Sequence, residues 1–265
     1  MSDYHEVQHG FQALDSFFSD KVKRAKFEQA LDEYFPGAFA AALNHFNGWW
    51  RSYQFSTYIA SISEHSDDED QDGRLSMWRA FGNNSPARVA IVLNVPRYLA
   101  GQSQLGIMFS PVAYLRQNEV HQQIEAIAAS IDKNIEFLKT VHHEIIVYIL
   151  FNMLLSAVVC LKHRGFHEER EWRVIYNPDR GRSPLMETST EIISGIPQTI
   201  HKLPLDKSVG EGLAALDFAR MFDRLIIGPT PYPTVIYEAL TTALMLAGVN
   251  NAGLRVTTSG IPIRN

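Results

Sequence analysis

The chain has 265 residues, of which 46% are hydrophobic and 20% charged, and it carries a net charge of −5. These fractions exclude a disordered chain, a collagen or a long coiled coil. The negative charge argues against a protein held to nucleic acid by bulk positive charge. The single cysteine, Cys160, excludes an internal disulfide and suits a reducing cytoplasm, where we place the protein.

Hydrophobic periodicity divides the chain into helical and strand-rich segments. Residues 1–54 are expected to be helical, with helices over Lys21–Tyr34 and Pro36–Trp50. Strands are then expected over Ser56–Ile62, Arg88–Asn94 and Gln104–Leu115, with a short helix over Leu75–Phe81. Val120–Lys162 is expected to be helical, as two helices or one kinked helix. After it we expect strands over Glu171–Tyr176, Arg224–Ile227 and Leu254–Thr258, and a helix over Pro233–Ala247.

One apolar run, Ile145–Leu161, tests whether the chain enters a membrane. Its seventeen residues include only Asn152 and Ser156 as polar members, and about 17 residues is the lower limit for a span. A helix buried in a domain core gives the same pattern. Because the run lacks an aromatic belt and leads directly into a strand-like segment, we favour the buried helix and expect no membrane contact.

Strands before and after a helical block indicate an α+β fold rather than repeated βαβ units. We expect a single domain over 1–265, in which a helical N-terminal segment (1–54) precedes a sheet-containing core (55–265). The expected architecture is a mixed β-sheet wrapped by helices, with one long buried helix.

Acidic and histidine clusters are weak candidates for metal binding. Asp68, Asp70, Asp72 and Gly73 match the opening of a calcium loop, but Arg79 stands where the loop needs its bidentate glutamate. A solvated acidic loop is the simpler interpretation. Gly165 interrupts the helical spacing of His163 and His167. We therefore expect no metal site.

Two hydroxyl residues, Ser61 and Ser63, fall on one face of the first expected strand. They either contact a ligand that approaches the strand end or bond the following turn. Farther along, Glu169, Glu171 and Arg173 alternate onto one face of an extended segment. An arginine beside a carboxylate pair keeps one acid ionised, which suits charge chemistry, although a surface salt-bridge ladder has the same pattern.

The C-terminal region offers a possible anion site. Gly228 and Pro229 follow an apolar strand and precede a helix, whose first amides can receive an anion. Arg264, near the end of the chain, is a cation that can reach the same edge. The alternative is an ordinary solvated terminus.

Read together, these segments resemble a bacterial family catalogued as domain of unknown function 2971 (DUF2971). The resemblance rests on Tyr58–Glu64, on the helix-turn Leu75–Gly82 with Trp78 and Arg79, and on Phe166–Arg173. It continues through Ile226–Pro229 and Ser259–Arg264. The resemblance implies that Met1–Val7 is the turn that follows the family's opening strand and helix, which have no counterpart here. Either the start codon was misassigned or the chain is a shortened member.

A more distant likeness concerns chemistry. The order Ser-x-Ser and then Glu-x-Glu is similar to ADP-ribosyltransferases of the Arg–Ser–Glu type. The resemblance implies that Ser61 or Ser63 braces NAD, that Glu171 stabilises the oxocarbenium-like transition state, and that Glu169 orients the acceptor. The first-strand arginine or histidine of that group has no clear match here.

Three functional hypotheses follow. The first is an NAD-dependent ADP-ribosyltransferase-like effector of a toxin or phage-defence system, with Glu171, Glu169 and Ser63 as catalytic residues and a protein as a possible acceptor. The second is a non-enzymatic sensor that binds a small anionic ligand in an Arg-rich cleft. Its expected ligand-binding residues are Ser61, Trp78, Arg79, Arg173, Gly228 and Arg264. The third is a catalytically inactive chain that keeps the fold.

Overall fold

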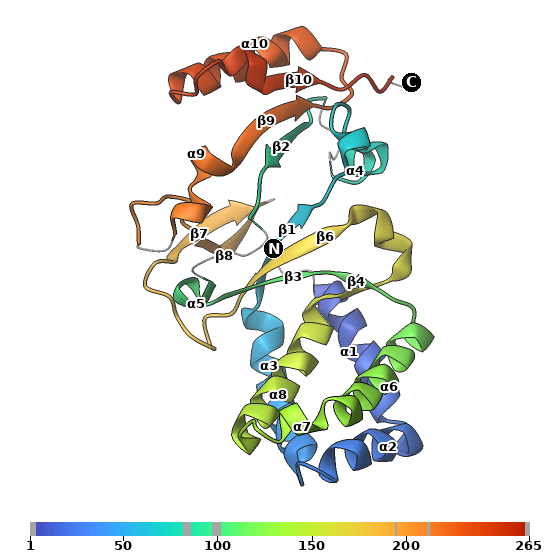
Figure 1. The fold of residues 1–265 in the computed structure, drawn as a ribbon. Helices are drawn as coiled ribbons and strands as arrows, with labels where there is room; N and C mark the ends of the chain where they lie inside the picture. The colour runs from blue at the N-terminus through green and yellow to red at the C-terminus, as the bar shows by residue number, and fades with distance from the viewer. Residues whose placement is uncertain (1–3, 82–85, 97–101, 194, 211–212, 263–265) are drawn as a thin grey trace. The chain divides into compact units, whose positions relative to one another are not determined.

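The structure, a computed structural model, describes residues 4–81, 86–96, 102–193, 195–210 and 213–262. It confirms the α+β class, because the described residues form helices and several small sheets (Figure 1). Contacts divide the chain into two compact units, 1–62 with 106–183 and 63–105 with 184–265. The one-domain organisation expected from the sequence stays a prediction.

The first unit is rich in helices. They are α1 (Tyr4–Phe18), α2 (Lys21–Asp32), α3 (Ala38–Ser56), α6 (Gln117–Lys133), the short α7 (Ile135–Leu138) and α8 (His143–Val159). Asp20 caps α2, because its carboxylate accepts hydrogen bonds from the amides of Val22 and Lys23 at 3.0 and 3.2 Å.

Several boundaries differ from those predicted. Tyr4–Val7 begins α1 and does not form a turn. Pro36 lies before α3, because Gly37 with a φ of 75° separates it from the helix. The stretch Val120–Lys162 contains three helices rather than one kinked helix or two.

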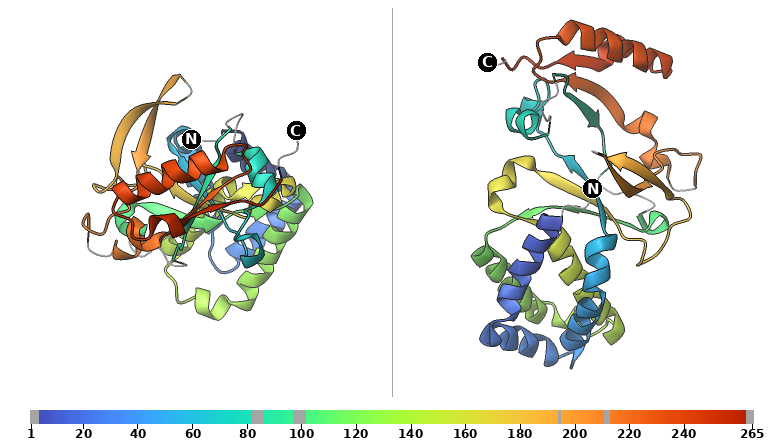
Figure 2. Two further views of the ribbon diagram at one scale, coloured as in Figure 1. Left: turned by 90° about the horizontal axis from the view of Figure 1, so that it is seen from above. Right: turned by 180° about the vertical axis from the view of Figure 1, so that it is seen from behind.

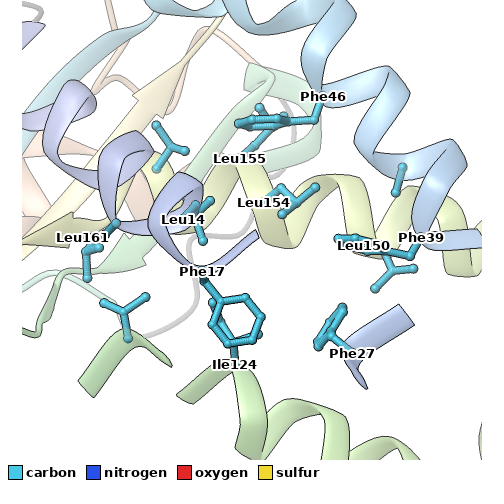
Figure 3. Packing of buried hydrophobic residues seen from close by; sticks show 14 of the residues in the cluster. Leu14, Phe17, Phe27, Phe39, Phe46, Ile124, Leu150, Leu154, Leu155 and Leu161 are labelled. Carbon is cyan, nitrogen blue, oxygen red and sulfur yellow. The ribbon is translucent and has the colours of Figure 1, made fainter. Parts of the chain in front are cut away.

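The helices of the first unit pack around one hydrophobic core. Figure 3 shows Phe17 beside Ile124, and Phe39 and Phe46 beside the leucines of α8. Phe27 belongs to the same cluster. On α6 the buried residues Val120, Ile124 and Ile131 follow helical spacing.

The apolar helix α8 contributes to this core through one face. Ile146, Leu150 and Leu154 are buried, but Tyr148 is 60% exposed and Ile149 is 51% exposed. The helix is therefore half-buried, not buried all round. Within the described residues, no helix combines the length and the apolar character that crossing a bilayer requires.

The sheet of the first unit has the strand order β1-β6-β3, with β1 at Tyr58–Ser63, β3 at Ile107–Pro111 and β6 at Glu171–Tyr176 (Figure 1). β3 and β6 are antiparallel, and Phe109 pairs with Val174. Two further short strands, β4 (Ala113–Tyr114) and β5 (Leu161–Lys162), pair in parallel. The predicted strand Gln104–Leu115 is thus wrong in extent, because it begins within the short helix α5 (Gln102–Leu105) and breaks at Val112.

The second unit contains a sheet of order β10-β9-β2, made of β2 (Val89–Leu93), β9 (Phe222–Ile227) and β10 (Val256–Thr258). β9 runs parallel to β10 and antiparallel to β2, so this sheet is mixed. The described strands form several small sheets instead of the one mixed sheet expected from the sequence. α10 (Pro233–Leu246) connects β9 to β10 and lies against both strands (Figure 2). The predicted strand from Leu254 is shorter, because Ala252–Arg255 forms a 3-10 turn, η4.

The remaining elements of the second unit are short or stand apart. They are the 3-10 turn η1 (Asp67–Glu69), α4 (Leu75–Ala80), η3 (Ala214–Leu216) and α9 (Phe218–Met221). β7 (Glu187–Ile193) and β8 (Ile196–Lys202) form an antiparallel hairpin that was not predicted from the sequence (Figure 2). Its signal was the alternation of Thr and Ile residues around Gly195, which has a φ of 81°.

Two helix glycines of the first unit give opposite predictions for the same substitution. Gly10 of α1 lies against α8, and a Cβ there would stand 2.3 Å from the Val158 carbonyl oxygen. Gly48 of α3 faces open space. We expect Gly10→Ala to lower the free energy of unfolding by about 1–3 kcal/mol, and Gly48→Ala to raise it by about 0.5–1 kcal/mol. Urea denaturation of both variants checks this, and equal effects would contradict the close packing of α1 on α8.

Candidate functional site

The candidate site is built on β6, the central strand of the first unit's sheet. Side chains alternate along a strand, and Glu171, Arg173 and Ile175 are buried, while Trp172 and Val174 are only half-buried. The prediction that Glu171 and Arg173 share a face is therefore confirmed.

Glu169 does not continue that face along the strand. It ends the 3-10 turn η2 (Arg164–Glu169), and Arg170 then bends the chain with a φ of 42°. This left-handed conformation costs a non-glycine residue about 1–2 kcal/mol. Glu169 instead approaches the site through Lys162, whose ammonium lies 2.5 Å from its carboxylate.

The carboxylate of Glu171 has four contacts with three side chains. Nε of Arg173 donates to Oε1 and Nη2 donates to Oε2, each at 3.2 Å. The hydroxyl of Ser61, on the adjacent strand β1, donates to Oε1. Lys162 Nζ lies 3.5 Å from Oε2, the longest of these contacts. The paired arginine contact is the strong, orientation-fixing type of carboxylate recognition.

Burial makes this network costly to break. Arg173 is 0% exposed, Glu171 7% and Lys162 8%. The two cations balance the charges of Glu169 and Glu171. Removing one member of such a buried set leaves an uncompensated charge, which is strongly destabilising. The four side chains are therefore expected to stay in these positions.

The environment keeps Glu171 ionised. Burial is the largest influence and acts to raise the pKa of Glu171, but the hydrogen bonds from Arg173 and Ser61 and the charges of Arg173 and Lys162 together lower it. An ionised carboxylate can stabilise a developing positive charge but cannot donate a proton.

Neighbouring groups complete the site. The backbone N–H of Glu171 donates to the hydroxyl of Tyr114 at 2.8 Å, and burial raises the pKa of that phenol. Burial also raises the pKa of the Cys160 thiol, which disfavours its thiolate as a nucleophile. Lys162 and Tyr114 were not predicted from the sequence. The one available signal was that Lys162 directly follows an apolar run.

The predicted catalytic serine, Ser63, is the last residue of β1 and falls in the second unit. The hydroxyl that meets Glu171 within the first unit is that of Ser61. A catalytic role for Ser63 stays a prediction.

Trp78 and Gly228, two of the predicted ligand-binding residues, pack against each other in the second unit. A Cβ on Gly228 would lie 2.7 Å from the indole, and one on Gly73 would lie 2.9 Å from it. The indole N–H donates to the carbonyl of Asp72 at 2.9 Å. These glycines are therefore explained by close packing on a buried tryptophan.

The three arginines of the predicted ligand site, Arg79, Arg173 and Arg264, lie in different parts of the chain. Arg79 is exposed in the second unit, and Arg173 is buried in the first with its guanidinium on Glu171. Arg264 lies outside the described residues. Convergence of the three arginines stays a prediction.

The acidic run Glu64–Asp72 is not simply solvated, because several of its carboxylates have specific partners. Glu69 pairs with Arg74 at 2.9 Å, and Asp70 pairs with Arg224 and with His65. The carboxylate of Asp72 accepts the amide of Gly260 at 2.5 Å. Over the described residues, no three His, Cys, Asp or Glu side chains gather closely enough to hold a metal ion.

Comparison with known proteins gives one match. The family model described as "Protein of unknown function (DUF2971)" matches residues 77–174, from α4 into β6. This stretch contains Trp78, Lys162, Glu171 and Arg173. No curated protein and no solved structure matches the chain. The chain is thus similar to a family of unknown function over the stretch that supplies most of the network.

The network predicts a specific pH dependence of stability. Replacing Glu171 by Gln leaves Arg173 buried without a full counter-charge, so we expect a loss of about 3–5 kcal/mol in the free energy of unfolding at neutral pH. Because the folded-state pKa of Glu171 is lowered, its stabilisation is present above its unfolded pKa of about 4.3. It is lost as the pH falls through the lowered value.

The difference in stability between the wild type and Glu171→Gln should therefore narrow in acid. Urea denaturation at a series of pH values measures it. Glu187→Gln is the matched control, because Glu187 is 69% exposed and should leave stability unchanged at neutral pH. A difference for Glu171→Gln that stays constant down to strongly acidic pH would contradict an ionised, stabilising Glu171.

Proposed function

We propose that the protein is an NAD-dependent ADP-ribosyltransferase-like enzyme with Glu171 as its catalytic carboxylate. The observation that supports this most directly is the hydrogen bond from Ser61 to Glu171 on adjacent strands of one sheet. The two residues are 110 positions apart in the chain. A serine and a glutamate to which the sequence resemblance gives roles at NAD therefore lie in contact, which supports the proposal.

The electrostatics of Glu171 suit the reaction. Breaking the bond between nicotinamide and ribose releases neutral nicotinamide and leaves positive charge on the ribose carbon. Arg173 fixes the Glu171 carboxylate from behind, and the lowered pKa keeps it ionised. A preorganised negative charge stabilises this cation-like transition state without rearrangement.

Substrate access requires one contact of Glu171 to be replaced. Both carboxylate oxygens already accept from protein groups, and the contact from Lys162 is the longest. A ribose hydroxyl would take the place of Lys162 at Oε2. Lys162 would then remain paired with Glu169, at 2.5 Å.

Glu169 has the second role. The acceptor group attacks the ribose carbon, a bond forms between them, and the acceptor loses a proton. Glu169 orients the acceptor and receives that proton, since it lies next to the catalytic residue and shares Lys162 with it. The acceptor is a protein side chain or a small nucleophile.

The resemblance to DUF2971 sets the biological context. We infer that the resemblance extends beyond the matched residues 77–174 to Ser61 and to Gly228. A role as an effector in a toxin or phage-defence system is the context that this family suggests.

Catalysis is tested by measuring nicotinamide release from NAD, with and without a mixture of candidate protein acceptors. We expect Glu171→Gln to slow release by about 100-fold or more, because a charge aimed at the transition state is lost. Ser61→Ala should slow it by about tenfold, since the carboxylate keeps its arginine contacts but loses one orienting bond. Glu187→Gln should react like the wild type.

The variants must be compared as folded proteins. Circular dichroism establishes the folded fraction of each variant. Ser61→Ala removes only a hydroxyl from an exposed residue, so we expect this variant to keep the fold. A folded wild type that releases no nicotinamide would contradict the transferase. So would equal rates of nicotinamide release by the wild type, the Ser61→Ala variant and the Glu171→Gln variant.

A further inference from the structure

A groove of about 590 Å³ lies between α3 and α8 in the first unit. Its aromatic residues are Trp49, Tyr148 and Phe151, and its charged or titratable residues include His45, Glu144 and Arg180. None of these residues belongs to the network around Glu171. Pockets for small molecules span about 300–1,000 Å³ and are lined mainly by apolar and aromatic side chains.

The groove follows from the packing of two helices. His143 bonds the Pro36 carbonyl oxygen at 3.2 Å just before α3, and His45 contacts the Phe151 ring farther along, with centroids 6.3 Å apart. The two helices therefore run in the same direction. Ala41, His45 and Trp49 recur every four residues on α3 and form one wall.

The aromatic walls leave apolar surface uncovered. Trp49 is 40% exposed and Tyr148 is 60% exposed. Planar aromatic rings bind flat partners by offset stacking or edge contact, beyond what buried area alone provides. A flat ring is thus the shape that this groove favours.

The charge at one end of the groove is fixed in place. The Arg180 guanidinium donates to Asn152 Oδ1 at 2.7 Å and lies 5.5 Å from the centroid of Phe151. Its contact to the Tyr148 hydroxyl is 3.5 Å. Among the residues that the structure describes, no carboxylate forms an ion pair with Arg180. Its positive charge is therefore available to an anion.

The other end carries the opposite charge. Glu144 lies two helical turns before Asn152 on α8, which is about 12 Å along the axis. A ligand with an anionic group is therefore oriented, because its charge is attracted to Arg180 and repelled by Glu144.

We propose that this groove binds a small, planar aromatic molecule that carries one anionic group. Its ring lies among Trp49, Tyr148 and Phe151, and its anion contacts Arg180. The site is independent of the proposed transferase activity, since it uses neither Glu171 nor Ser61.

Two fluorescent probes of the same shape test the proposal, the anionic anilinonaphthalenesulfonate and the neutral phenylnaphthylamine. We expect both to bind the folded wild type saturably at one site. Arg180→Gln should weaken binding of the sulfonate about tenfold, because it removes one charge-assisted contact. It should change binding of the neutral amine by less than about twofold. Arg180→Lys should restore most of the sulfonate affinity.

A second variant blocks the groove without touching Arg180. Ala41→Trp fills one wall and should abolish binding of both probes, while Leu246→Ser, which changes an 86% exposed leucine of the second unit, should affect neither. Thermal unfolding establishes that each variant is folded. Probe binding that survives Ala41→Trp, or that Leu246→Ser removes, would overturn the site, and so would equal effects of Arg180→Gln on the two probes.

Discussion

A buried cation, the guanidinium of Arg173, sets the constraint on which the first unit depends. Arg173 is 0% exposed, and a guanidinium does not lose its proton in a protein. Its charge and its donors must therefore be satisfied internally. Glu171, two residues earlier on the same face of β6, supplies the carboxylate, and the carbonyl of Val159 at the end of α8 accepts a further bond. One side chain thus joins the central strand to the principal core helix.

The buried charge of Arg173 also determines the contacts and the ionisation of Glu171. Because Arg173 occupies one side of the carboxylate, the remaining positions go to Ser61 from β1 and to Lys162 from β5. Glu169 balances Lys162. The set is electrically neutral and mostly buried, so its geometry is stable while its central carboxylate stays ionised. These contacts stabilise the first unit, and under the proposed function they would also hold the carboxylate ready for the transition state.

Several features of the second unit have a packing explanation. Trp78 is buried against Gly228 and Gly73, and the acidic run is fixed by Arg74, Arg224 and Gly260. These residues belong to the motifs that the sequence offered as ligand or metal sites. Their contacts lie within the unit itself, and they shape the fold around its sheet. The groove between α3 and α8 in the first unit, in contrast, is lined by residues that belong to none of the predicted ligand or metal sites.

The sequence by itself determined what local periodicity encodes. The alternation of β6 placed Glu171 and Arg173 on one face, and β2, α4 and α10 fall within a residue or two of their predicted bounds. Only the tertiary structure decided which distant groups meet them. Lys162, Tyr114 and Ser61 come from three other segments, and the order β1-β6-β3 brings β1 beside β6. Such pairings depend on loop closure and on burial of the whole core, which no short window of residues contains.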